Sequence, residues 1–124
     1  MNAAVATAKQ MPFVGGGQMR QPNELDLRRI VRQLEKRARY RYVMPLVDAC
    51  ENGYRIQSPC CSRNVDAGGG IIDIAWLEYD MALDVWMLYR KEHALGRWQF
   101  HVQAQRLSEV MDCLIRDPAR VFWQ

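Results

Sequence analysis

The chain has 124 residues and a mass of 14.5 kDa, and 49% of its residues are apolar, which suffices for one domain with its own core but not for several domains. No apolar run is long enough to cross a bilayer, and residues 1–8 lack the basic and apolar regions of a secretory signal, so we expect a cytoplasmic protein. Residues 1–63 carry 11 Lys/Arg and 5 Asp/Glu whereas residues 64–124 carry 6 and 9, a polarity that suits an acidic partner or the pairing of two copies.

Residues 1–22 mix Gln, Gly, Met and Pro without periodicity, so we expect a disordered tail, followed by a single domain over residues 23–124. Asn23 precedes acidic residues, as an N-cap does at the positive end of a helix dipole. The spacing predicts a helix from Glu24 to Arg39 with an apolar stripe of Leu27, Ile30, Val31, Leu34 and Ala38. The opposite face of this helix is basic, with Arg28, Arg29, Arg32, Lys36 and Arg39.

The pattern then changes to a period of two, which predicts strands. Tyr40 to Met44 begins one strand, Asn52-Gly53 favours a hairpin turn, and Tyr54 to Gln57 returns. Ile71 to Tyr79 carries apolar residues in both alternation sets around Asp73, the pattern of a central strand buried on both faces.

Two further strands are expected after this central one. Val85 to Arg90 is the first. In the second, the apolar residues Trp98, Phe100, Val102 and Ala104 alternate with the polar residues Gln99, His101, Gln103 and Gln105. The alternation predicts a strand whose apolar set faces the core and whose polar set faces water.

Leu107 to Arg116 returns to helical spacing and stops at Asp117-Pro118. The segment Val121-Phe122-Trp123 is too apolar to stay in water, so we expect it to pack on the body or on a second subunit. The sequence therefore predicts an α+β fold: an N-terminal helix, an antiparallel twisted sheet of about five strands and a C-terminal helix, with both helices on one sheet face.

The stretch from Ser58 to Asp66 holds the densest chemistry in the chain. Its adjacent thiols Cys60 and Cys61 suit a metal or redox site, but no Cys-x-x-Cys is present and neighbouring residues on an extended backbone point oppositely. Structural thiols are the alternative, and we predict no metal and no cofactor. Arg63 and Asn64 beside the glycines suit an anion cradle, or else a hairpin loop bonded to its own backbone.

Cys61 with His101 or His93 and Asp73 would supply a nucleophile, a base and an orienting carboxylate. Nothing in the spacing of these residues favours that arrangement. The sequence therefore leans away from an enzyme, and no catalytic residue is predicted.

The segments Arg37 to Val43, Ser58 to Asp66 and Val121 to Trp123 resemble those of a small uncharacterised proteobacterial family of unknown function. The resemblance covers residues 23–124. It implies a bacterial cytoplasmic protein and no particular activity, cofactor or functional residue.

The combined features predict a non-enzymatic binding module, homodimeric through the open sheet face or the aromatic C-terminus. Its basic helix face, together with Arg63 and Asn64, would take an acidic partner. Two alternatives remain: a nucleic-acid-binding regulator that uses the same helix, and a thiol- or metal-dependent enzyme centred on Ser58 to Asp66.

Overall fold

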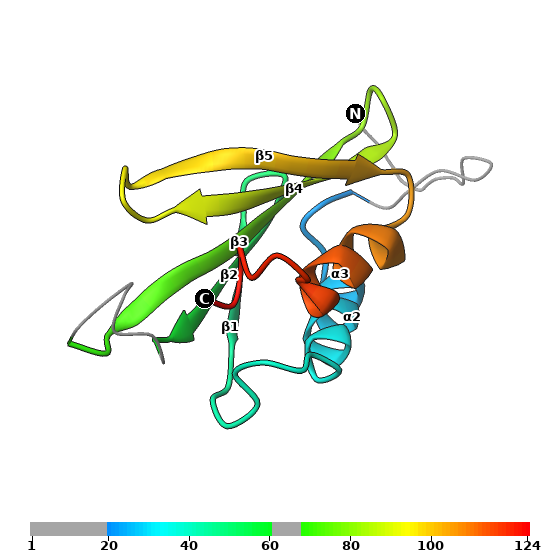
Figure 1. The fold of residues 1–124 in the computed structure, drawn as a ribbon. Coiled ribbons are helices and arrows are strands. Elements are labelled where there is room, and N and C mark those ends of the chain that lie inside the picture. Colours follow the sequence, from blue (N-terminus) through cyan, green and yellow to red (C-terminus); the bar gives the residue numbers. More distant parts are fainter. Residues whose placement is uncertain (1–19, 61–67) are drawn as a thin grey trace.

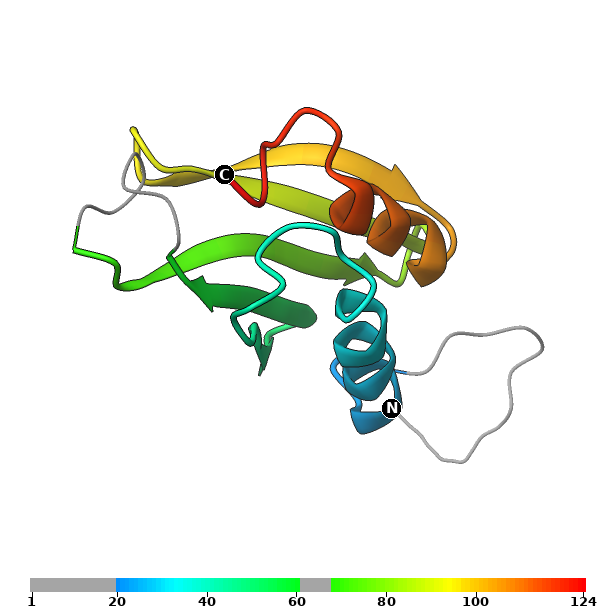
Figure 2. The ribbon, with the colours of Figure 1, turned by 60° about the horizontal axis from the view of Figure 1, so that its bottom comes forward.

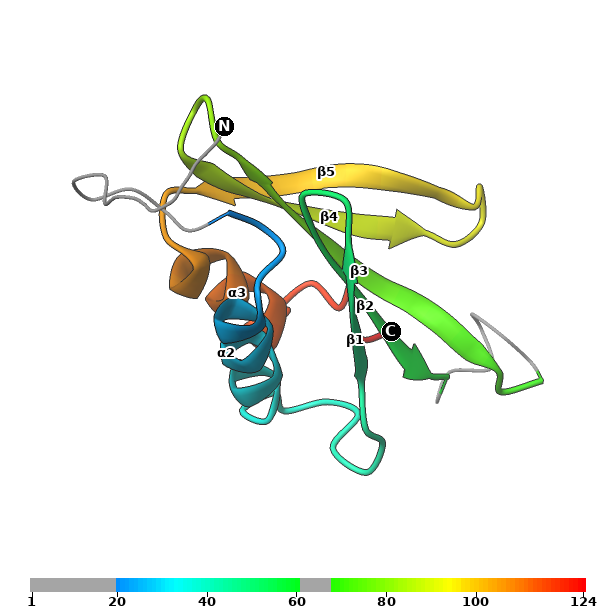
Figure 3. The same cartoon turned by 180° about the vertical axis from the view of Figure 1, so that it is seen from behind.

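The computed structural model describes residues 20–60 and 68–124. In chain order its elements are α2 (Glu24–Leu34), β1 (Leu46–Cys50), β2 (Gly53–Pro59), β3 (Ile71–Asp80), β4 (Val85–Glu92), β5 (Arg97–Ala104) and α3 (Leu107–Arg116). The strands form a five-stranded antiparallel sheet in the order β1-β2-β3-β4-β5, so each strand pairs with its neighbours in sequence. Both helices pack against one face, here called the inner face (Figures 1 and 3). The predicted α+β fold is confirmed.

The chain enters α2 through a buried hydrogen-bond cluster around Asp26. Asn23 is the N-cap, because its Oδ1 accepts from the Asp26 backbone N–H at 2.8 Å. Gln21 is only 6% exposed and donates from Nε2 to Asp26 Oδ2 at 2.7 Å, while Tyr54 Oη donates to Gln21 Oε1 at 2.6 Å. Gln21, which the sequence assigned to the tail, thus packs as part of the domain; residues 1–19 lie outside the described residues.

The first helix ends at Leu34, five residues before the predicted end at Arg39. The buried Arg37 accounts for the early end, because its guanidinium donates to the carbonyls of Leu34, Tyr40 and Val43 at 2.7, 2.7 and 2.5 Å. Arg37 thus ties the last residue of the helix to the chain reversal that follows, where Tyr40 has φ +59°. The strand predicted from Tyr40 is therefore wrong at its start, and β1 begins at Leu46. Neither helix of the described ranges is long and apolar enough to cross a membrane.

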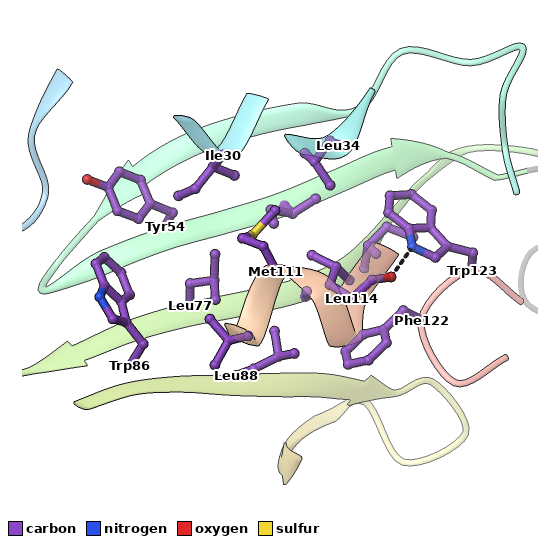
Figure 4. Close-up of a cluster of buried hydrophobic side chains, with 14 of the residues drawn as sticks. Ile30, Leu34, Tyr54, Leu77, Trp86, Leu88, Met111, Leu114, Phe122 and Trp123 are labelled. Carbon is purple, nitrogen blue, oxygen red and sulfur yellow. Dashed lines mark hydrogen bonds between the residues drawn. The ribbon is translucent and has the colours of Figure 1, made fainter. Parts of the chain in front are cut away.

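The core fills the space between the helices and the inner face (Figure 4). Its largest fully buried side chains are Ile30, Tyr54, Ile56, Ile74, Leu77, Trp86, Leu88, Val110, Met111, Leu114, Phe122 and Trp123. Phe122 and Trp123 come from the C-terminal segment, so the prediction that this segment packs on the body is confirmed. The aromatic C-terminus is sealed inside its own chain and is not available as a dimer surface.

A buried carboxylate holds the C-terminal segment in place. Asp117 is 1% exposed, and its carboxylate accepts from the backbone N–H groups of Val121, Phe122 and Trp123 at 2.8, 3.1 and 2.8 Å. Trp123 Nε1 donates to the Leu114 carbonyl at 2.9 Å, the dashed bond in Figure 4. The carboxylate thus replaces water as the acceptor for three backbone N–H groups of the C-terminal segment, and the indole N–H satisfies one carbonyl in the last turn of α3.

A register shift between β4 and β5 corrects the predicted faces of β5. Leu88 pairs with Val102 but Tyr89 pairs with Phe100, so His101 is the extra residue of a bulge. Val102 and Ala104 keep to the core, whereas Trp98 and Phe100 turn to the other face of the sheet, here called the outer face. His101 turns inward instead, where its ring lies 4.9 Å from that of Phe122.

Candidate functional site

The outer face carries a row of aromatic side chains. Arg55 of β2, Trp76 of β3, Tyr89 of β4 and Phe100 of β5 are directly paired across successive strands and therefore share one face. The Trp76 and Tyr89 ring centroids lie 5.3 Å apart, and those of Tyr89 and Phe100 lie 5.9 Å apart. We call these three rings the aromatic row. Their tilted and edge-on contacts are favourable geometries for aromatic pairs.

A linked polar row runs beside the aromatic row. Gln57 Nε2 donates to Asp73 Oδ1 at 3.0 Å, and Asp73 Oδ2 lies 3.1 Å from Lys91 Nζ. The ammonium of Lys91 also lies 4.8 Å from the ring centroid of Trp98, whose ring contacts Trp76 at 5.9 Å. These contacts hold the second tryptophan against the aromatic row.

Large apolar side chains on this face are only partly covered by the described residues. Phe100 is 52% exposed, and the outward-facing strand residues Leu46 and Ile71 are 45% and 54% exposed. Trp76, Tyr89, Trp98 and Met87 are half-buried. No described helix lies over this face (Figures 1 and 3). Partly exposed large apolar side chains gathered on one face are typical of an interaction site.

A second candidate is the cleft between α2 and the start of α3. It has a volume of about 450 Å³ and is lined by Asp26, Arg29, Arg32, Gln33, Arg106, Leu107 and Ser108. Arg29 is tied to Asp26 at 3.1 Å, whereas Arg32 is exposed and has no ion pair with a described residue. The cleft therefore combines unneutralised arginine charge with a concave surface.

The predicted basic helix face is divided in the structure. Arg28 is exposed and lies 3.6 Å from Glu24, outside the cleft. Lys36 is exposed beyond the end of α2. Arg39 is half-buried and donates to the Asp117 carbonyl at 2.6 Å, which gives it a structural role. Arg63 and Asn64 lie outside the described residues. Among the predicted residues that the structure describes, only Arg29 and Arg32 thus converge on one cleft, where they are joined by Arg106, which sequence reasoning missed.

The structure describes only part of the stretch to which the thiol alternative was assigned. Cys50 and Cys113 are half-buried free thiols, Cys60 is half-buried, and Cys61 lies outside the described residues. Burial raises the pKa of the Cys50 thiol, which keeps it in its unreactive form. Within residues 20–60 and 68–124 no group of three or more His, Cys, Asp or Glu side chains is placed to hold a metal ion.

His101 does not form the catalytic arrangement considered from the sequence. His101 turns to the inner face, whereas Asp73 belongs to the polar row of the outer face. His93 follows β4, and burial lowers its pKa while Asp73 partly opposes that effect. His101 and Asp73 are thus on opposite sides of the sheet, so they cannot act as a base and its orienting carboxylate.

Sequence reasoning missed the aromatic row because it assigned Trp98 and Phe100 to the core. The sequence did contain one signal of this row. Trp76 and Tyr89 alternate with residues that already supply an apolar face for the core, so they add apolar side chains to the opposite face of the same strands. A sheet with apolar residues on both faces and helices for only one is expected to expose the other.

A family model described as "Domain of unknown function (DUF3024)" matches residues 19–124 of this chain. No curated protein and no solved structure matches it. The match includes Gln21, in agreement with the burial of that side chain.

Proposed function

Because the chain belongs to the DUF3024 family, whose description names no activity, we propose from its geometry that it is a small binding module that pairs with a second copy through the outer sheet face. The aromatic row with Trp98 is the observation that carries this proposal. Tryptophan, tyrosine and phenylalanine are enriched in the centres of protein interfaces, where a few such rings supply most of the binding free energy.

The charges of the outer face favour a second copy over a nucleic acid. The strands place four acidic and two basic side chains on this face, namely Asp48, Arg55, Asp73, Glu78, Asp80 and Lys91. A two-fold interface matches a surface to itself, so it needs both signs of charge on the same surface. Nucleic acid needs an excess of cations for its phosphates, whereas acidic side chains outnumber basic ones among the described strand residues of this face.

One pair of opposite charges is especially suited to this role. Asp48 and Arg55 are opposite each other in register, both are exposed, and neither forms an ion pair with a described residue. They flank the β2 end of the aromatic row. In a face-to-face pair each would meet the opposite charge of the other copy at the polar rim that surrounds an apolar interface centre.

The direct test is the oligomeric state of the full chain and of Phe100→Glu, measured by sedimentation velocity at micromolar concentration. Phe100 is 52% exposed, so the carboxylate should leave the fold intact but place a charge in the interface centre. We expect a dimer for the unmodified chain and a dissociation constant about 30-fold higher or more for the variant, the loss of one aromatic hot spot.

Leu83→Glu is the matched control, because Leu83 is 64% exposed in the turn before β4 and belongs to no strand of the outer face. This variant should remain a dimer. If the unmodified chain is a monomer, the proposal of self-association is wrong. If Phe100→Glu and Leu83→Glu have equal dissociation constants, the interface does not include the aromatic row.

A second candidate function is the binding of an acidic protein segment in the cleft between α2 and α3. The convergence of Arg29, Arg32 and Arg106 on a cleft of about 450 Å³ favours it, since guanidinium groups bind carboxylates through paired hydrogen bonds. Each lost charge-assisted bond should cost about 1.5–3 kcal/mol of binding free energy.

Fluorescence anisotropy with a labelled polyglutamate peptide tests this second function. The triple variant Arg29→Gln, Arg32→Gln, Arg106→Gln should lose binding, whereas the same change at Arg41, Arg97 and Arg116, which are exposed elsewhere, should retain it. Equal loss in both triple variants would show attraction by net charge alone. Binding of a single-stranded oligonucleotide in place of the peptide would favour the nucleic-acid alternative.

A further inference from the structure

A second concave region lies where the C-terminal segment passes the end of β4. It has a volume of about 510 Å³ and is lined by Arg90, Lys91, Glu92, His93, Ala94, Arg120, Val121 and Gln124. Figure 2 shows the C-terminus lying over strands β4 and β5 near this end of the sheet. The volume falls within the range of small-molecule sites. The region is separate from the aromatic row and from the cleft between the helices.

Arg90 is fixed in this region without a neutralising acid. Its Nη2 donates to Gln99 Oε1 at 2.9 Å, and its Nη1 lies 3.2 Å from His101 Nδ1. Burial lowers the pKa of His101, and the charge of Arg90 lowers it further, so the imidazole is neutral and accepts at Nδ1. Both partners of Arg90 are therefore uncharged, and its full positive charge remains.

Arg120 approaches from the C-terminal segment with a free side chain. It is exposed and makes no side-chain hydrogen bond or ion pair with a described residue. Its φ of +56° is in the left-handed region, which glycine adopts at lower cost than an arginine does. The turn is nevertheless held, because the Arg120 N–H bonds to the Asp117 carbonyl at 3.0 Å and the Asp117 carboxylate binds the three N–H groups that follow. The fold thus places an arginine where glycine would suit the backbone.

The charged side chains that line the site carry a net positive charge. The Lys91 ammonium is paired with Asp73 at 3.1 Å. Glu92, the one acidic side chain among the lining residues, accepts from Gln99 and lies 4.0 Å from Arg97. His93 is half-buried, and burial lowers its pKa, so it can donate one N–H as a neutral ring.

We propose that this cavity binds a small organic anion, with the guanidinium groups of Arg90 and Arg120 holding its carboxylate or phosphate group. A planar guanidinium donates two parallel hydrogen bonds to such an oxyanion. The remaining volume takes the organic part of the ligand. This site is independent of the self-association and acidic-partner proposals above.

Thermal unfolding of the full chain with inorganic phosphate or succinate, at ionic strength matched with chloride, tests the site. Both probes should raise the midpoint for the unmodified chain, and Arg120→Gln should weaken the binding about tenfold to a hundredfold. Arg41→Gln, which removes an exposed arginine elsewhere, should keep the full response. A response confined to phosphate or to succinate identifies the group that is held.

Arg120→Gly separates ligand binding from backbone stability. It should raise the midpoint without ligand, because glycine accepts the left-handed conformation, and yet abolish the response to the probes. Arg90→Gln should also abolish the response; if it fails to fold, the two Arg120 variants decide the question. The proposal is overturned if neither probe stabilises the chain beyond chloride, or if Arg120→Gln responds as Arg41→Gln does.

Discussion

On the inner face of the sheet the large rings are sealed from water, whereas on the outer face rings of the same kind remain partly exposed. Trp86 and Trp123 are each 1% exposed in the core, while Phe100 is 52% exposed. The inner rings pack against aliphatic side chains from both helices. The outer rings contact one another and are flanked by the Asp73–Lys91 ion pair and the Gln57 amide.

This difference separates two uses of apolar side chains. Burial in the core stabilises the fold of one chain, by roughly 25 cal/mol for each Å² removed from water. Apolar area on the outer face gains that free energy only when a partner covers it. Substitutions on the inner face should therefore lower mainly the free energy of unfolding, whereas substitutions on the outer face should weaken mainly the association of two copies.

The largest effect on unfolding is expected at Trp123 of the inner face. Trp123→Ala removes a side chain that is 1% exposed, and with it the hydrogen bond to Leu114 and the tilted ring contact with Tyr40, whose centroid lies 5.5 Å away. We expect the free energy of unfolding to fall by about 3–5 kcal/mol in urea denaturation.

Trp123→Phe serves as the control for volume. It keeps most of the ring and loses chiefly the indole N–H bond, so it should cost about 1–2 kcal/mol. Equal and small losses for both variants would show that the C-terminal segment contributes little to the core.

Periodicity predicted the elements from particular residues but not their irregularities. The N-cap Asn23 and the apolar stripe that includes Ile30 predicted α2, and Asn52-Gly53 predicted the first hairpin. Helix caps, apolar stripes and turn residues are local signals, so they can be recognised in the sequence. The bulge at His101 has no such signal, since it depends on how β4 and β5 pair. One extra residue there exchanged the faces of Trp98 and Phe100.

The candidate sites were less predictable than the fold for the same reason. Arg39 looked like a surface cation on a regular helix, but the chain reversal held by Arg37 turns it toward Asp117, which lies 78 residues away in sequence. Arg106 and Arg120 stand alone in the sequence and join other arginines only through tertiary packing. The spacing of residues along the sequence does not indicate which distant residues the fold brings together.

A smaller effect on the inner face is expected from protonation of His101. Burial lowers its pKa below the ordinary value of 6.5, Arg90 lowers it further, and Asp117 opposes both. The unfolded chain therefore binds this proton more readily than the folded chain does, so the free energy of unfolding is fully retained above about pH 6.5 and falls as the pH drops through the folded pKa.

His101→Gln should flatten this dependence, as measured by urea denaturation at about pH 7.5 and about pH 5.5. Glutamine can still accept a hydrogen bond from Arg90 but does not titrate. Identical losses on acidification in the variant and the unmodified chain would exclude His101 as a source of acid sensitivity.

The smallest effect on unfolding is expected on the outer face, at Phe100. Phe100→Thr keeps a residue with high strand propensity and removes a ring that is already 52% exposed, so the free energy of unfolding of the monomer should change by only about 0.5 kcal/mol. The measurement is urea denaturation at a protein concentration below the dissociation constant, where association contributes nothing. At higher concentration the same substitution should lower the apparent stability further, because it weakens the dimer. A loss as large as that of Trp123→Ala at low concentration would make the aromatic row part of the core and remove the premise of the self-association proposal.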